Sequence, residues 1–255
     1  MKQLSKPSVL TAICALGGFL CLLLRQWLFA TGLNERGLLE PGHPGNWLSW
    51  VLTGAVSLLL IFLFFTWKDK HVTCSFPLSP LSGAASLFLA CGYGIAAWNL
   101  LAAFLSSDTQ IAGTSPLLDC IAGALAVLCI LCTLLIALGQ FRGQRMHPLL
   151  HCPGILFFAC YLIHCYSLWS GEPQLQLFFF QMMAIIFFMI TVFCRAELAA
   201  GKISGRNYLL FSRAAIFMSI AAVSHSSEPL LYLFFALALL PDGCSTWKKE
   251  PKPGE

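Results

Sequence analysis

Charged side chains are scarce in this sequence. Asp, Glu, Lys and Arg together make up 10% of its 255 residues, whereas 58% of the residues are hydrophobic. A soluble domain carries roughly 25% charged residues, so this chain has too few charges to cover a surface that faces water. The charges that it does have lie in short groups between long apolar runs. This distribution excludes an ordinary soluble domain and predicts that lipid is the solvent.

The apolar runs also lack the strict alternation of apolar and polar residues that strands would show. Each run is close to the roughly 20 residues that a helix needs to cross about 30 Å of hydrocarbon. An open sheet in lipid would leave backbone groups unpaired. We therefore predict an all-α, polytopic transmembrane helical bundle without a soluble domain. Its eight predicted spans cover residues of about 8–30, 46–66, 83–105, 116–140, 148–169, 175–194, 208–224 and 227–241.

The last predicted span, 227–241, is short, and a re-entrant or interfacial segment is the alternative for it. Basic residues favour the full count of eight, with both termini in the cytoplasm. In that topology only Arg36 lies in an outer loop, as the positive-inside rule predicts. Twelve of the 15 Lys and Arg residues then fall in cytoplasmic segments: Lys2, Lys6, Lys68, Lys70, Arg142, Arg145, Arg195, Lys202, Arg206, Lys248, Lys249 and Lys252.

Enzyme signatures are missing. The sequence has no GxxxxGK[ST] phosphate loop, no HExxH, no GxSxG and no paired intramembrane carboxylates. His147 and His151 are four residues apart, but no Glu or further ligand pair accompanies them. Cys129 and Cys132 lie inside an apolar run, where Cys usually behaves as a small hydrophobe. We predict no catalytic residue, no metal site and no cofactor, and the scattered basic groups do not indicate nucleic acid.

Polar side chains gather toward the outer side of several predicted spans. Polar groups within spans are costly and usually face protein or water. One interpretation is an outward-facing polar cavity, in which Arg25 binds an anionic group or pairs with Asp119. The alternative is that these side chains only form hydrogen bonds between helices or reach the membrane surface. The candidate cluster consists of Arg25, Asn99, Asp119, His164, Gln174 and Gln181.

Two further features concern packing. Ser82, Ser86, Ala90 and Gly94 repeat every four residues on the third predicted span, and such a ridge of small residues lets helices approach closely. Arg213 lies about five residues inside the seventh span. We expect its side chain to reach the cytoplasmic lipid phosphates, with pairing inside the bundle as the alternative.

The segments YSLWSGEPQLQ at 166–176 and RGQRMHPLL at 142–150, together with Gly42-His43-Pro44 in the first outer loop, carry a resemblance. They make much of the chain similar to uncharacterised polytopic membrane proteins of anaerobic gut bacteria. The resemblance implies a multi-pass protein of the bacterial cytoplasmic membrane. It adds no substrate, cofactor or catalytic residue, because such proteins have no established activity.

Three functions remain after these observations. The first is transport or binding of a small solute through the outer polar cluster. The second is a non-catalytic structural or accessory subunit that docks a membrane protein partner through its small-residue ridges. A lipid-modifying enzyme is the third, and the missing motifs make it the least favoured. In every case the lipid bilayer is a predicted partner.

Overall fold

The computed structural model describes residues 7–34, 38–40, 42–66, 80–105, 115–144, 146–170, 175–200, 205–226 and 228–244. Within these ranges the regular structure is helical, apart from one isolated bridge between Leu33 and Leu39. The elements, with η for short 3-10 helices, are α1 (Pro7–Thr31), α2 (Pro44–Thr66), α3 (Pro80–Leu105), α4 (Pro116–Phe141), η1 (Pro148–His151), α5 (Cys152–Trp169), η2 (Leu175–Phe178), α6 (Phe179–Ala199), α7 (Gly205–Ala222), η3 (Val223–His225) and α8 (Pro229–Cys244).

Six segments are long and apolar enough to cross a membrane, and they correspond to α1, α2, α3, α4, η1 with α5, and α6. The apolar parts of α7 and α8, Asn207–Ala222 and Pro229–Pro241, are shorter. The prediction of a helical membrane bundle is therefore confirmed. The count of eight spans stays a prediction, because two of the eight helices fall short of the length that a crossing usually needs.

Proline and glycine mark where the helices begin and end. Helices α1, α2, α3, α4 and α8 each begin at a proline, whose fixed φ suits the first helical turn and whose missing N–H costs nothing there. Helix α4 ends at Phe141, and Gly143, two residues later, has a φ of +68°. The amide of Gln144 donates to the Gly139 carbonyl at 2.8 Å, and that of Gly143 to the Gln140 carbonyl at 3.2 Å. This is a Schellman cap, which needs a left-handed residue.

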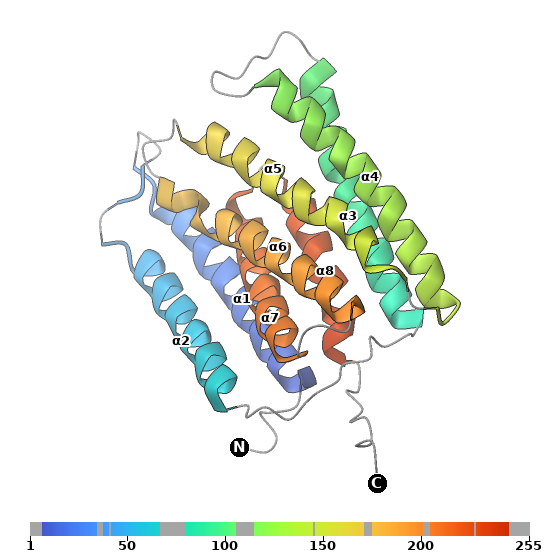
Figure 1. Ribbon diagram of the computed structural model, residues 1–255. Helices are drawn as coiled ribbons and strands as arrows, with labels where there is room; N and C mark the ends of the chain where they lie inside the picture. The colour runs from blue at the N-terminus through green and yellow to red at the C-terminus, as the bar shows by residue number, and fades with distance from the viewer. Residues whose placement is uncertain are drawn as a thin grey trace.

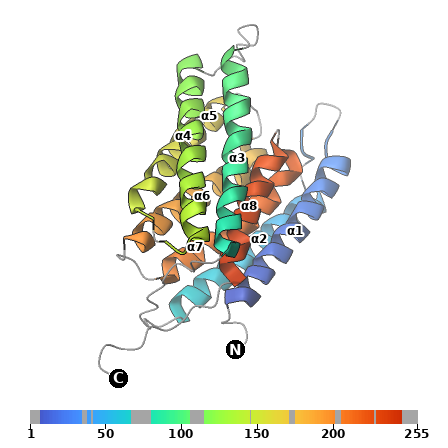
Figure 2. The ribbon, with the colours of Figure 1, turned by 90° about the vertical axis from the view of Figure 1, so that its right-hand side faces the viewer.

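The helices run alternately in opposite directions, so that α1 begins and α8 ends at the same end of the bundle (Figure 1). We call the opposite end the far end. Helices α3 and α4 form the most extensive pair, and Figure 2 shows them projecting beyond the other helices at the far end. Helix α7 packs against α1, α6 and α8, which makes it the centre of the remaining helices.

Aromatic rings fill the centre of the bundle. Tyr93, Phe157, Phe158, Phe188 and Phe235 come from α3, α5, α6 and α8, and their neighbouring rings lie 4.6–6.0 Å apart. These distances allow edge-to-face and tilted contacts, which add to the energy of burying the rings. This packing ties the α3–α4 pair to the other helices.

Large apolar side chains cover much of the outside. On α2, Leu58, Phe62 and Phe65 are exposed, and on α4 Leu117 and Leu131 are exposed as well. In water such continuous apolar faces would promote association, whereas in a bilayer they meet lipid tails. The surface therefore agrees with the membrane class that the composition predicts.

The small-residue ridge on α3 is largely enclosed. Ser82, Ser86 and Ala90 are buried, and the Ser86 hydroxyl donates to the Gln140 side-chain oxygen on α4 at 2.7 Å. Gly94 is different, because a Cβ added there would meet nothing within 4 Å. Three of the four ridge positions thus face other helices of the same chain.

The expectation that Arg213 reaches lipid phosphates is wrong. Its side chain is fully buried, and Nη1 donates to the Ser212 hydroxyl at 2.7 Å. Helix α7 is surrounded by α1, α6 and α8, so a side chain on its inner face has no short route to the membrane surface. The alternative, an arginine held inside the bundle, describes its position.

Candidate functional site

Arg25 lies at the far end of α1, enclosed by other elements. Its side chain is 4% exposed. Nε donates to the Ser224 hydroxyl at 2.9 Å, and Nη2 donates to the Leu177 carbonyl at 2.9 Å. The guanidinium carbon also lies 4.4 Å from the centre of the Phe180 ring and 5.1 Å from that of Phe29. Elements η2, α6 and η3 therefore hold a buried cation through neutral groups.

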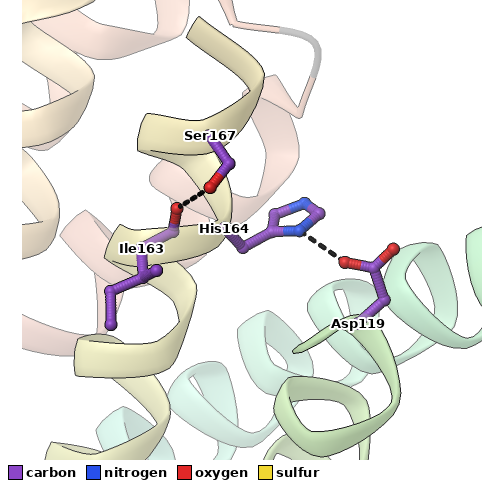
Figure 3. A network of polar contacts seen from close by, with 4 residues as sticks. All are labelled: Asp119, Ile163, His164 and Ser167. Carbon is purple, nitrogen blue, oxygen red and sulfur yellow. Dashed lines mark hydrogen bonds and ion pairs between the residues drawn. The ribbon is translucent and has the colours of Figure 1, made fainter. Parts of the chain in front are cut away.

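Asp119 does not pair with Arg25, and that expectation is wrong. Asp119 Oδ1 instead lies 2.7 Å from His164 Nδ1, with both side chains largely buried. Figure 3 shows the two side chains pointing toward each other across the gap between α4 and α5. The contact becomes an ion pair when the imidazole is protonated. In the low dielectric of a bundle such a contact is far stronger than in water.

A second polar contact lies next to this pair. The Tyr161 hydroxyl donates to Glu228 Oε2 at 2.7 Å, and the Tyr161 ring stacks against the His164 ring with their centroids 6.1 Å apart. Tyr161 was not among the residues predicted from the sequence. Its signal was available, because Tyr161 precedes His164 by three residues and so shares its helix face.

The remaining residues of the predicted cluster are spread over other helices. Gln181 is buried on α6, directly after Phe180, whose ring covers Arg25. Asn99 is half-buried on α3. Gln174 lies outside the described residues. The structure thus brings together Asp119 and His164, while Arg25 is held separately by residues that the sequence did not single out.

Among the residues that the structure describes, no three His, Cys, Asp or Glu side chains are arranged to hold a metal ion. His147 is used locally, since its Nδ1 accepts from the Leu149 amide at 3.3 Å. His43 is used in the same way in the loop before α2, where its Nδ1 accepts from the Gly45 amide at 3.1 Å. Both histidines therefore shape the backbone next to a helix start.

Comparison with known proteins finds no match for this chain among family models, curated proteins or solved structures. The chain is an integral membrane protein. That class rests on its six apolar helices of membrane length and on its exposed apolar faces. The polar groups at the far end are what remains to be explained by function.

Proposed function

We propose that this protein binds a small anionic solute at the far end of the bundle and carries it across the bacterial cytoplasmic membrane. Arg25 is the group that recognises the solute. The observation behind this proposal is that Arg25 is buried yet bonded to a hydroxyl, a carbonyl and two aromatic faces. Within the described part of the chain, no carboxylate lies within ion-pair distance of it.

A buried cation without a counter-charge is costly. An arginine inside a membrane protein usually pairs with an acid or marks the path of a substrate or ion. The two neutral acceptors and the aromatic rings orient the guanidinium but leave its positive charge uncancelled. A carboxylate or phosphate group on the solute would supply the missing negative charge. It would also accept the strong, directional hydrogen bonds that a guanidinium donates.

Other polar contacts toward the far end join further helices. Asp119–His164 joins α4 to α5, and Tyr161–Glu228 joins α5 to the start of α8. Ser224, which holds Arg25, precedes Glu228 by four residues. A change in the position of α8 or η3 would therefore affect both Arg25 and the Tyr161 contact, which is the kind of coupling that a transporter needs.

The topology in this proposal has eight crossings with both termini in the cytoplasm. Support comes from the common end at which α1 begins and α8 ends (Figure 1), since that arrangement requires an even number of passages. The far end would then face outward. The alternative function, docking of a partner through the small-residue ridge, is less favoured because Ser82, Ser86 and Ala90 are buried within the chain.

The test is ligand-dependent thermal stability of the purified, full-length protein in detergent. Acetate, succinate, glutamate and inorganic phosphate serve as probes, each compared with sodium chloride, which has no carboxylate or phosphate group, at equal ionic strength. A ligand at about 100 times its Kd stabilises the folded state by about 2.7 kcal/mol, so at least one probe should raise the Tm of the wild type by several degrees. Arg25→Gln should abolish this rise, and Arg25→Lys should weaken it.

Arg142→Gln is the matched control, because Arg142 is exposed at the end of α4. This variant removes the same charge and should keep the response of the wild type. If none of the probes stabilises the wild type, or if Arg25→Gln responds as the wild type does, the proposed role of Arg25 is wrong.

A further inference from the structure

The chain between α1 and α2 folds back on itself at the far end of α1 (Figure 2). Its described arms are residues 32–34 and 38–40, and Leu33 and Leu39 form an antiparallel bridge between them. Two further backbone hydrogen bonds, of 2.8 and 2.9 Å, join the same arms. The two arms therefore pair as a small hairpin does, and we call them the strap.

The two leucines of the bridge have different surroundings. Leu33 is 37% exposed, whereas Leu39 is only 7% exposed. Leu39 packs with Leu28 of α1 and Leu177 of η2 in an apolar cluster that is separate from the main core of the bundle. Among the described residues of the strap, Leu39 alone has a buried side chain. Leu39 therefore attaches the strap to both α1 and η2.

This apolar cluster lies against the groups that hold Arg25. Leu177 provides the carbonyl that accepts from Arg25 Nη2. Phe29, whose ring faces the guanidinium, also packs against the cluster. Leu28 and Phe29 follow Arg25 by three and four residues, so they lie about one helical turn, roughly 5.4 Å, nearer to the far end. Leu39 therefore covers the side of Arg25 that points toward the far end.

Glycines stand at both ends of the strap. Gly32 directly follows α1, and Gly42 lies two residues before α2 with a φ of +89°, a conformation that glycine adopts easily. The second end is also fixed to α1, because the His43 ring lies against Trp27 with their centroids 5.2 Å apart. A segment with so few buried apolar contacts opens more easily than the packed helices around it.

We infer that the strap is a lid over Arg25, latched by Leu39, which lifts to admit an anion from the far end and then closes over it. The inference rests on the proposed function, since it takes Arg25 as the group that binds the solute. Arg25 is 4% exposed, so a covering element has to move before a solute can reach the guanidinium. The strap is the covering element whose attachment is weakest, and it serves as the outer gate of the transporter.

The experiment measures access to Arg25 without any solute. Ser224, whose hydroxyl accepts from Arg25 Nε at 2.9 Å, is replaced in the full-length protein by Ser224→Cys. A small anionic methanethiosulfonate reagent modifies the thiol in detergent, and mass spectrometry of the peptide that contains position 224 gives the rate. Adding Leu39→Ala should raise this rate by at least about tenfold, because truncating a buried leucine shifts the strap toward its open position.

Leu33→Ala is the matched control, because it removes the same atoms from an exposed leucine of the strap that lies outside the cluster. It should leave the rate at position 224 unchanged. The native thiol of Cys14, buried on the same helix α1, reports general loosening and should stay slow in every variant. Leu39→Val should give a smaller acceleration and serves if Leu39→Ala does not accumulate.

An unchanged rate at position 224 in Leu39→Ala and Leu39→Val, or an equal acceleration in Leu33→Ala or at Cys14, would overturn the lid. Because the assay contains no candidate solute, its result is separate from that of the binding test. Anion binding that depends on Arg25, together with an unchanged rate at position 224, would leave the proposed function standing and remove the lid alone.

Discussion

Replacing His164 with leucine should lower the free energy of unfolding by about 3 kcal/mol, because it leaves a buried carboxylate without its partner. The Asp119 and His164 side chains are only 7% and 11% exposed, and the atoms that meet are 2.7 Å apart. Their contact also joins α4 to α5 (Figure 3), so the loss should loosen that pair of helices. Reversible unfolding in mixed detergent micelles measures the effect.

The double variant Asp119→Leu/His164→Leu distinguishes a pairing effect from a packing effect. Removing both polar groups leaves no buried charge, so the double variant should be more stable than His164→Leu alone. Ser167→Ala is the control on the same helix, since the Ser167 hydroxyl donates to the Ile163 carbonyl of its own turn at 2.9 Å. Losses that simply add in the double variant would mean that the two residues are not coupled.

Gly18→Ala should lower the free energy of unfolding by about 2 kcal/mol, because it overpacks the contact between α1 and α7. A Cβ on Gly18 would lie 2.9 Å from the Phe217 carbonyl oxygen and 3.1 Å from Ile220 Cβ. Backbone atoms of a central helix cannot move aside as a flexible side chain can. The same unfolding measurement applies.

Gly17→Ala is the matched control for this prediction. A Cβ on Gly17 would meet Val56 Cγ2 at 3.4 Å and the Phe217 ring at 3.5 Å, which are ordinary contact distances. The neighbouring substitution should therefore be nearly neutral or slightly stabilising, since alanine suits a helix better than glycine. Similar losses in both variants would contradict the close approach of α1 to α7.

The helices were predictable from the sequence because each depends on a local signal. Apolar runs of membrane length, started by residues such as Pro44 and Pro116 and ended by Gly143, carry that signal. Where a proline sets the start of a helix, the observed start differs by a few residues from the predicted one. Helix α3 begins at Pro80 rather than at residue 83, because a proline is favoured in the first turn.

The partners of the polar side chains were not predictable in this way. Arg25 and Asp119 were expected to pair because both lie at a similar depth in the membrane. Depth alone does not tell which helices are neighbours. Helix α1 packs against α2, α7 and η3, whereas α4 packs against α3 and α5. Arg25 therefore meets Ser224, and Asp119 meets His164.

A small pocket beside Gly154, between α3, α4, α5 and α6, was missed for the same reason. In the sequence His151 stands out only with His147, its neighbour on the chain, whereas in the structure His151 lines the pocket with Arg195 from α6 and Tyr93 from α3. A pocket formed by four helices leaves no spacing that a single sequence reveals. The small residue at Gly154 was its only local sign, and the sequence offers many glycines.

The direct test of the membrane account is a set of topology reporters, such as alkaline phosphatase, which is active only outside the cytoplasm. Fusions within residues 106–114, between α3 and α4, should be active, because this segment follows the far end of α3. Fusions at 142–145 and after Cys244 should both be inactive. Activity at 142–145, or at the C-terminal fusion alone, would contradict the eight crossings and the outward-facing position of Arg25.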